Sequence, residues 1–424
     1  MKVMVVGGGG REHAIVKAIA ASPLVDKIYA LPGNAGMAEA ECVPIGAKEL
    51  DRIVAFAREN KIEFAVVAPD DPLVMGLVDL LEGEGIPCFG PTKAAAVIEG
   101  SKAFSKELMK RHCIPTAAYE IFTEEKEALR YLERCPLPAV VKADGLALGK
   151  GVIIAETREE AVRAVKSMME DKIFGESGNR VVIEEFLTGP EVSVLAFTDG
   201  STVVPMVSSM DHKRALDGDR GPNTGGMGTV APNPFYTEDV ARECMEKIFL
   251  PTVRAMREEG RTFRGCLYFG LMLTEAGPKV IEYNCRVGDP ETQVVLPLLK
   301  SDLFSIMQSV AAGTLKEEDV VFSGDSACCV VLASEGYPQK YETGYPVTLD
   351  PLPADTYVYY AGVKEKDGAL VTAGGRVLGV TATAKTLPDA IAKAYSAADG
   401  VHFENACRRT DIGKRAMEKI GNGI

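Results

Sequence analysis

The chain has 424 residues, of which 46% are hydrophobic and 25% charged, and its formal net charge is -13 at pH 7. This composition is typical of a folded protein with two to four domains, and it excludes a largely disordered or fibrous chain. Because the negative charge repels phosphate backbones and anionic lipids, a general role in binding nucleic acid or membrane surfaces is disfavoured.

The ten cysteines show no CxxC spacing, and the N-terminal apolar stretch is too short for a signal peptide or membrane helix. No other apolar run approaches the ~20 residues that span a bilayer. We therefore expect a cytoplasmic protein with reduced cysteines, no nucleic-acid or membrane partner, and a monomeric or weakly homo-oligomeric state.

The first hundred residues alternate between apolar strands and amphipathic helices. Strands are expected at 2–6, 27–31, 64–68 and 87–90, and helices directly after the first glycines, at 48–59 and at 73–82. This βα alternation predicts a parallel sheet covered by helices, with ligands bound beyond the carboxyl ends of the strands.

The middle of the chain reads as a mixed α+β region. Helices are expected at 102–111, 158–170 and 238–259, and strands around 140 and at 152–155, 181–183, 192–197, 266–273 and 279–283. Residues 205–234 are rich in Gly and Pro, which predicts a long functional loop rather than a sheet. From residue 327 onward, β-rich stretches and a helix at 387–398 indicate a small C-terminal domain.

A glycine turn follows the first strand, at Gly7–Gly10, and continues into Arg11, Glu12 and His13. Such a turn can aim backbone N–H groups at a phosphate, but it is equally consistent with ordinary strand-to-helix geometry. A dinucleotide site requires GxGxxG, and counting from Gly7 places Glu12 at the third glycine position. NAD binding is therefore disfavoured.

A second glycine-rich segment joins the expected strands near 140 and 152. Lys142 and Lys150, with the mobile backbone between Gly145 and Gly151, suit a polyphosphate that must be covered and then released. A Walker A loop is excluded, because its two glycines would be too close and Gly151 replaces the metal-binding hydroxyl residue. Taken alone, the segment could be a surface hairpin.

Two further strands end in polar residues. The segment 183–191 offers backbone groups for a purine edge and carboxylates for ribose hydroxyls, although solvated acids at a strand end are the commoner explanation. In the strand 280–286, period-two alternation places Glu282, Asn284 and Arg286 on one face. Hard oxygen ligands beside an arginine suit magnesium and a transferring phosphoryl group.

Taken in order, these segments resemble the ATP-grasp ligases and, within them, the phosphoribosylamine–glycine ligase family. The resemblance covers nearly the whole chain and rests on VVGGGGREHAI, LPGNAG, GSKAFSK, VVKADGLALGKGV, IEEFLTGPEVSV, DHKRALDGDRGPNTGGMG, IEYNCRVGDPETQ, GGRVLGVTA and RRTDIG.

The resemblance implies an α/β and α+β protein with three parts. Residues 1–101 would form an N-terminal parallel-sheet domain, and 102–325 an ATP-grasp domain with a lid at about 120–190. Residues 326–424 would form a small β-rich C-terminal domain. The implied reaction joins glycine to 5-phosphoribosylamine through a glycyl phosphate, giving glycinamide ribonucleotide, ADP and phosphate in de novo purine biosynthesis.

The resemblance also implies roles for individual residues. ATP would be bound by Lys102, Lys142, Gly145, Gly149, Lys150, Gly151, Glu184, Glu185, Phe186, Leu187 and Glu191. Magnesium or manganese would be bound by Glu282 and Asn284. Arg286, Lys213 and Asp211 would act in catalysis. The other substrates would contact Gly9, Gly10, Arg11, Asn223, Thr224, Gly225, Gly226, Asp289, Pro290 and Glu291.

The sequence departs from the family pattern at three places. Gly270 stands where many ATP-grasp enzymes carry an additional acidic metal ligand, Val287 replaces the usual Phe, and Pro69–Pro72 differs from the usual Pro-Glu-Ala-Pro. The alternative functions are a bicarbonate- or formate-using ATP-grasp enzyme, a nucleotide-binding regulator without turnover, and an NAD-binding module.

Overall fold

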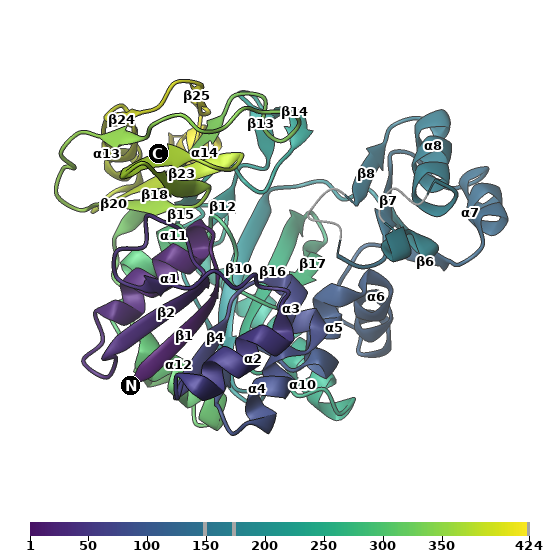
Figure 1. Cartoon of the computed structure of the whole chain (residues 1–424). Helices are drawn as coiled ribbons and strands as arrows, with labels where there is room; N and C mark the ends of the chain where they lie inside the picture. The colour runs from purple at the N-terminus through teal and green to yellow at the C-terminus, as the bar shows by residue number, and fades with distance from the viewer. Residues whose placement is uncertain (147–150, 172–174, 422–424) are drawn as a thin grey trace.

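The computed structural model describes residues 1–146, 151–171 and 175–421. Figure 1 shows three bodies, with the N-terminal domain below the C-terminal region and a smaller subdomain set apart from both. The strands of a central sheet, β10 (Glu191–Thr198), β16 (Gly265–Thr274) and β17 (Gly277–Asn284), lie between these two regions and the smaller subdomain.

The N-terminal domain is the predicted parallel sheet. Its five strands run in the order β3-β2-β1-β4-β5, and all neighbouring pairs are parallel. Their bounds are β1 Lys2–Gly7, β2 Lys27–Pro32, β3 Glu41–Cys42, β4 Phe64–Val67 and β5 Cys88–Phe89. Val3 and Val5 pack into one core while Met4 and Val6 pack into another, so both faces are buried, as helix-covered parallel sheets require.

The helices of this domain are α1 Gly10–Ala20, α2 Leu50–Glu59, α3 Asp70–Met75, α4 Leu77–Gly83 and α5 Lys93–Gly100. The prediction of a single helix at 73–82 is wrong. Gly76 has a φ of 98°, a left-handed conformation that ends α3 and lets α4 start in a new direction.

A separate outer subdomain, residues 119–185, contains a four-stranded sheet in the order β6-β9-β7-β8. Its elements are β6 Tyr119–Phe122, α7 Glu125–Leu132, β7 Ala139–Ala143, β8 Val152–Ala155, α8 Arg158–Met169 and β9 Val181–Glu185. It has its own apolar core, which includes Leu132, Val141 and Ile183. Figure 1 shows it projecting to one side of the other parts.

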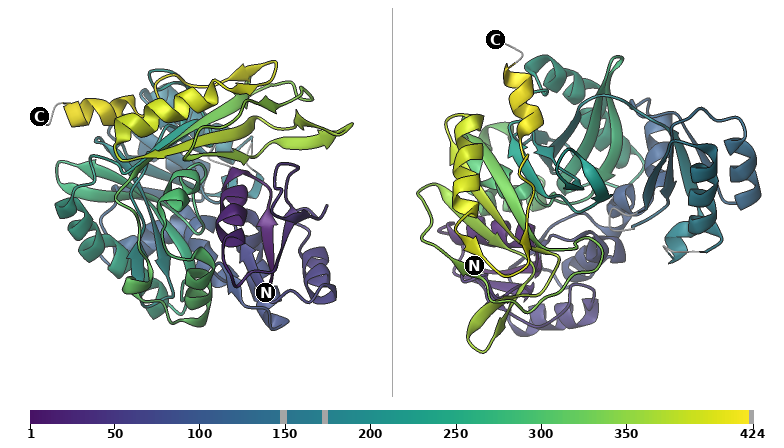
Figure 2. Two further views of the ribbon diagram at one scale, coloured as in Figure 1. Left: turned by 90° about the vertical axis from the view of Figure 1, so that its left-hand side faces the viewer. Right: turned by 90° about the horizontal axis from the view of Figure 1, so that it is seen from above.

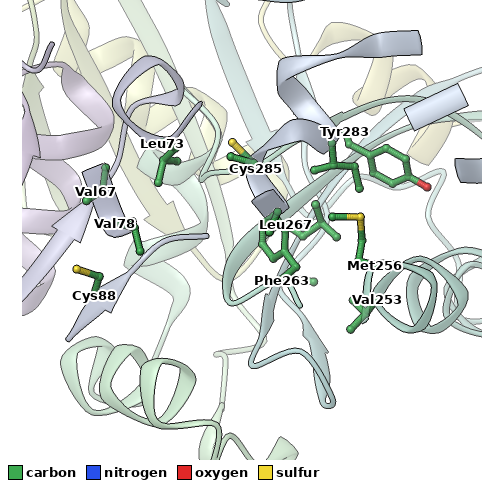
Figure 3. Packing of buried hydrophobic residues seen from close by; sticks show 14 of the residues in the cluster. Val67, Leu73, Val78, Cys88, Val253, Met256, Phe263, Leu267, Tyr283 and Cys285 are labelled. Carbon is green, nitrogen blue, oxygen red and sulfur yellow. The ribbon is translucent and has the colours of Figure 1, made fainter. Parts of the chain in front are cut away.

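The central sheet has the order β11-β10-β16-β17, with antiparallel neighbours. Its strands are β10 Glu191–Thr198, β11 Val203–Pro205, β16 Gly265–Thr274 and β17 Gly277–Asn284, and the helices around it include α6 Lys102–Arg111, α9 Glu238–Cys244 and α10 Leu250–Glu258. Figure 3 shows one core shared between Val67 of the N-terminal sheet and Leu267 and Tyr283 of the central sheet.

The predicted helix 238–259 is helical from Glu238 to Glu258, although a π-helical turn at Met245–Phe249 separates α9 from α10.

Residues 205–234 do not form the loop without sheet structure that the sequence predicted. They contain β12 Met210–Asp211, β13 Arg214–Leu216, β14 Arg220–Asn223 and β15 Gly228–Ala231. β15 pairs with β18 of the C-terminal region, and β13 and β14 form a hairpin. The partner of β15, the strand β18, is distant in sequence, so no local alternation pattern predicted this pairing.

The C-terminal region is built on a six-stranded sheet, β12-β15-β18-β23-β20 with β25 beside β18. The bounds are β18 Ser326–Ser334, β20 Thr356–Tyr360, β23 Arg376–Ala384 and β25 Ala406–Cys407, with α13 Leu387–Ala398 packed on the sheet. The remaining elements are α11 Thr292–Val295, α12 Leu303–Ala312, β19 Thr348–Leu349, β21 Val363–Lys366, β22 Ala369–Thr372, β24 Val401–His402 and α14 Lys414–Gly421. Figure 2 shows this region lying over the N-terminal domain.

Candidate active site

All parts of the fold contribute to one cavity of about 780 Å³. The N-terminal domain supplies Arg11, the outer subdomain Lys142, the central sheet Glu282 and the C-terminal region Arg376. A large concave site at the junction of several domains is the usual place for small-molecule chemistry. Most of the residues predicted from sequence to bind ligands meet here.

Two of the predicted phosphate-binding lysines lie on one side of the cavity. Lys102, at the start of α6, donates a hydrogen bond from Nζ to the carbonyl oxygen of Gly145 at 2.7 Å. Lys142, on β7, donates to the carbonyl oxygen of Ile281 at 3.1 Å. Burial lowers the pKa of Lys102, while the carboxylate of Glu282 opposes that shift. Both ammonium groups are thus held by the main chain at the cavity wall.

The glycine segment between β7 and β8 is described only at its ends. Gly145 and Gly151 line the cavity, as does Leu146. Gly149 and Lys150, both predicted to bind ATP, lie outside the described residues.

The end of β9 forms the neighbouring wall, where Glu184, Glu185, Phe186 and Leu187 all line the cavity. Glu184 is buried, and the side chain of Phe186 is exposed. Glu185 makes an ion pair with Lys279 at 2.9 Å, and this contact lowers the pKa of the Glu185 carboxyl. Its side chain is therefore already engaged by the protein.

Glu191 begins β10 and also lines the cavity. Its carboxylate lies 3.6 Å from the Nζ of Lys213, which is also 3.6 Å from a carboxylate oxygen of Glu282. One ammonium group therefore connects a predicted ribose ligand to a predicted metal ligand.

Glu282, Asn284 and Arg286 follow one another along β17 and just beyond it, and all three line the cavity. Tyr283 and Cys285 between them are buried. The period-two prediction is confirmed for these residues. A bulge places Gly270 of β16 opposite Glu282 but Leu271 opposite Val280, so the alternation restarts at Glu282.

The charge of Glu282 is set by the surrounding cations. Burial opposes ionisation of the carboxyl group, but Lys213, Lys142 and Lys102 outweigh it, and the pKa of Glu282 is lowered. The side-chain oxygen of Asn284 accepts a hydrogen bond from Arg286 at 3.1 Å and retains a second lone pair. An ionised carboxylate and an amide oxygen fit a hard divalent cation.

No cluster of three or more His, Cys, Asp or Glu side chains suited to a metal ion is found within residues 1–146, 151–171 and 175–421.

A side chain at Gly270 would lie close against Glu282. A Cβ at this position would lie 3.1 Å from Cγ of Glu282 and 3.4 Å from its carbonyl oxygen. Glu191 on β10 is the other carboxylate that contacts Lys213.

Arg286 is anchored by a buried carboxylate. Its Nη2 lies 3.2 Å from Glu99 of α5, and Glu99 also accepts a hydrogen bond from the Cys285 N–H at 2.7 Å. Burial opposes the Arg286 charge, but Glu99 and Asp70 outweigh it and raise its pKa. The guanidinium therefore stays charged at the cavity wall.

Asp211 and Lys213 come from β12 and the residues directly after it. Burial raises the pKa of Asp211 well above its usual value, and the nearby Glu291 acts in the same direction. Burial works against the charge of Lys213, but Glu191 and Glu282 outweigh it and raise its pKa. The pair thus combines a carboxyl group that ionises reluctantly with a firmly charged ammonium.

A residue of the C-terminal region, Arg376, binds the predicted loop 223–226. Arg376 donates to the carbonyl oxygens of Gly225 at 2.8 Å and Asp289 at 3.0 Å, and to the Asp289 carboxylate at 2.8 Å. Asn223, Thr224 and Gly225 line the cavity. Gly226 does not, and a Cβ there would lie 2.4 Å from Pro290 and 2.7 Å from Asp211.

The N-terminal glycine turn reaches the same region. Arg11 and Asp289 line the cavity, and Arg11 donates to the carbonyl oxygen of Val287 at 3.3 Å. A Cβ on Gly9 would lie 3.7 Å from Asp289. Gly10 packs away from the cavity, against Gln293, and Pro290 packs against the loop rather than lining the cavity.

Known protein families match this chain in its N-terminal, middle and C-terminal parts. Family models of phosphoribosylglycinamide synthetase match in chain order, the N domain at residues 1–99, the ATP-grasp (A) domain at 100–292 and the C domain at 327–415. The chain belongs to the phosphoribosylamine–glycine ligase family. This confirms the resemblance and the mixed fold class predicted from the sequence.

Individual members of the phosphoribosylamine–glycine ligase family match over their full length. The one from Halalkalibacterium halodurans is 49% identical over 419 residues, covering 98% of this chain and 97% of the relative. The one from Salmonella typhimurium is 47% identical over 429 residues, covering 100% of both chains.

Solved structures match as well. A crystal structure of phosphoribosylamine–glycine ligase from Thermotoga maritima superposes with a TM-score of 0.86 at 37% identity, covering 97% of this chain and 100% of that one. A biotin carboxylase domain of Hydrogenobacter thermophilus 2-oxoglutarate carboxylase has a TM-score of 0.75 at 20% identity, covering 96% and 91%. The latter likeness concerns the fold alone.

Among the cavity residues that were missed from the sequence are Lys106, Tyr268, Tyr337 and Arg376. Tyr268 donates a hydrogen bond to the buried Glu291 at 3.1 Å, and Tyr337 accepts one from the Gly225 N–H at 3.1 Å. Only Lys106 carried a signal, one helical turn after Lys102. The other three lie far in sequence from the residues they contact.

The sequence predicted no membrane partner, and the structure bears on this only through its helices. Within the described part of the chain, none of the helices is both long and apolar enough to span a bilayer.

Proposed function

We propose that this chain catalyses the ATP-dependent ligation of glycine to 5-phosphoribosylamine in de novo purine biosynthesis, releasing glycinamide ribonucleotide, ADP and phosphate. Full-length membership of the phosphoribosylamine–glycine ligase family supports the reaction. The observation that best supports the location of the active site is the cavity that Lys142, Glu282 and Arg11 line together, because these residues come from three parts of the fold. We also propose that the enzyme works in the cytoplasm.

The chemistry requires activation of a carboxylate. The carboxylate of glycine is a poor electrophile for an amine, whereas a glycyl phosphate carries a good leaving group. In the proposed sequence, ATP first phosphorylates the glycine carboxylate, and the amine of phosphoribosylamine then displaces the phosphate. Exclusion of water from the cavity during the reaction would protect the mixed anhydride from hydrolysis.

We assign the side of the cavity near the outer subdomain to ATP. Lys102 and Lys142 would contact its phosphates, and Gly145 to Gly151 would cover them. The end of β9, Glu184 to Leu187, would line the adenine. Phe186 supports this assignment, because its exposed aromatic side chain lines the cavity and could pack against a purine ring. Glu191 would bind the ribose.

A divalent cation, Mg²⁺ or Mn²⁺, would be held by Glu282 and Asn284 and would supply charge neutralisation between the ATP phosphates. Arg286 lies just beyond the end of β17, next to these ligands, and forms an ion pair with Glu99, so its guanidinium is preorganised for the charge that develops on the transferring phosphoryl group.

The remaining substrates are assigned to the opposite side. Asp211 and Lys213 would orient glycine, with the ammonium of glycine facing the carboxyl group and its carboxylate facing the lysine. The loop 223–226 would bind phosphate. Arg11 and the turn 289–291 would shape the phosphoribosylamine pocket.

A phosphate-release assay tests the function. With phosphoribosylamine generated in place, glycine should stimulate phosphate release from MgATP, and omission of either substrate should stop it. Bicarbonate and formate serve as matched small carboxylates. Release that proceeds equally with either of them in place of glycine would contradict the proposal, and ATP binding without ADP formation for any substrate would indicate a regulator.

A further inference from the structure

Two lysines share one buried carboxylate on the ATP side of the cavity. Lys106 of α6 and Lys142 of β7 place their Nζ atoms 2.9 Å and 3.0 Å from the two carboxylate oxygens of Glu184. The three residues are 2%, 4% and 4% exposed. Sequence analysis assigned roles to Lys142 and Glu184 but none to Lys106.

The cluster is tied to the central sheet by two different routes. Lys106 donates to the hydroxyl of Thr116 at 2.8 Å, and that hydroxyl donates to the carbonyl oxygen of Val280 at 2.7 Å. Lys142 donates to the carbonyl oxygen of Ile281 at 3.1 Å. Both lysines line the cavity, but the ammonium of Lys106 lies between two side-chain partners, Glu184 and Thr116, whereas Lys142 has Glu184 as its one side-chain partner among the described residues.

Charge counting distinguishes the two lysines. Two ammonium groups and one carboxylate leave one positive charge in the cluster. If Lys106 were neutral, Lys142 would be the only counterion of a buried carboxylate. Breaking such a buried pair is costly, because it leaves an uncompensated charge. Lys142 would then have little attraction left to offer a polyphosphate.

We propose that Lys106 is a positioning residue, which holds and neutralises the Glu184 carboxylate so that the charge of Lys142 remains available to the phosphates of ATP. This inference rests on the proposed function, because it assumes that ATP occupies this side of the cavity. Lys106 does not have to touch the nucleotide.

The direct test measures the Kd of MgATP by calorimetry on the full chain without glycine. Lys106→Met, which keeps the length of the side chain, should weaken binding by about tenfold or more, the usual scale for losing one charge-assisted contact. Lys110→Met is the matched control, because Lys110 lies one turn further along α6 and is exposed. The control should bind MgATP within about twofold of wild type.

A double variant separates electrostatics from packing. Adding Glu184→Gln to Lys106→Met removes one negative charge and restores the single positive charge of the cluster, so most of the lost affinity should return. If the loss stayed the same in the double variant, Lys106 would have only a packing role and the inference would be overturned. If Lys106→Met does not fold, Lys106→Gln takes its place in both comparisons.

The pH profile gives an independent reading. Burial lowers the pKa of Lys106 to about 8. The carboxylates of Glu184 and Glu185 oppose this shift, and the ammonium of Lys142 adds to it. The ring of Tyr119 also packs on the Lys106 ammonium. Above pH 8 the charge of Lys106 is lost. The Kd of MgATP should therefore rise between pH 7 and 9 in wild type and rise less in Lys106→Met.

The proposed function and this inference fail in different ways. If Lys142→Met bound MgATP like wild type, the nucleotide would not lie here and the proposed site would be wrong. If Lys142→Met lost affinity while Lys106→Met did not, the ATP site would stand and only the role of Lys106 would be refuted.

Discussion

At the scale of single residues, the shared orientation of Glu282, Asn284 and Arg286 depends mainly on the local strand. Alternation along one strand predicts that they share a face, and all three line the cavity. Their electrostatic environment is not local, because the cations around Glu282 come from α6, β7 and the residues after β12.

Glu282→Ala should reduce kcat for phosphate release by at least about 100-fold, because it removes the only carboxylate of the proposed cation site. The assay is glycine-dependent phosphate release across a series of Mg²⁺ concentrations. Glu275→Ala is the matched control, since Glu275 lies exposed in the turn of the same hairpin. Full activity of Glu282→Ala would refute the metal assignment.

At the scale of elements, strand pairing decides which side chains can stand beside each other. Gly270 of β16 lies opposite Glu282 of β17, and its lack of a side chain leaves space for the Glu282 side chain. The sequence alone suggested a missing metal ligand at Gly270. The register supplies a different reason for the glycine, namely the close approach of the Glu282 side chain.

Gly270→Ala should therefore displace the Glu282 carboxylate and lower kcat by about tenfold while the protein still folds, because the new methyl group must push the side chain by a few tenths of an ångström. Steady-state kinetics and the melting temperature measure the two effects. Gly83→Ala is the control, because its Cβ would meet nothing within 4 Å. Wild-type kcat in Gly270→Ala would contradict this account.

His212, directly after β12, connects that strand to the end of the chain. Its Nδ1 lies 3.1 Å from the carbonyl oxygen of Gly228, and its Nε2 accepts a hydrogen bond from the Gly413 N–H at 3.1 Å. Burial and the nearby Arg409 lower the pKa of His212 to about 4. The ring is thus neutral in the folded enzyme.

This shift predicts how stability depends on pH. The unfolded chain binds a proton at His212 near pH 6.5, but the folded chain binds it only near pH 4. Stability is therefore fully present above pH 6.5 and is lost as the pH falls toward 4, by about 2 kcal/mol between pH 7 and 5. His13, with its pKa also lowered to about 4, mainly by burial, acts in the same direction.

His212→Gln should make the melting temperature less sensitive to pH between 7 and 5, by roughly half, because His13 remains. Scanning calorimetry at both pH values measures the difference. His402→Gln is the control, because that histidine is exposed. An unchanged pH dependence in His212→Gln would show that its neutral ring contributes nothing.

At the scale of the whole molecule, the C-terminal region helps to complete a site that begins in the N-terminal domain. Arg376 of β23 binds Gly225 and Asp289, and the cavity is also lined by Arg11. The site thus depends on how separate bodies are assembled, as Figure 2 shows for the regions at the two ends of the chain.

Arg376→Ala should raise the KM for phosphoribosylamine by about tenfold and leave the KM for ATP nearly unchanged, because it frees the loop and the turn at Asp289 on the side away from the nucleotide. Lys364→Ala, on the exposed hairpin of the same region, is the control. Equal increases in both KM values would indicate a general structural loss instead.

The sequence by itself determined the elements whose patterns are local. The parallel N-terminal sheet, helix 102–111, strand 152–155 and the polar face of β17 followed from periodicity and glycine placement. The tertiary structure alone decided that β12 and β15 join the C-terminal sheet, that Lys106 and Lys142 share Glu184, and that Arg376 reaches the cavity. The physical reason is the same in each case: these contacts join segments far apart in the chain, and their favourable energy appears only once separate elements pack together, so no local pattern encodes them.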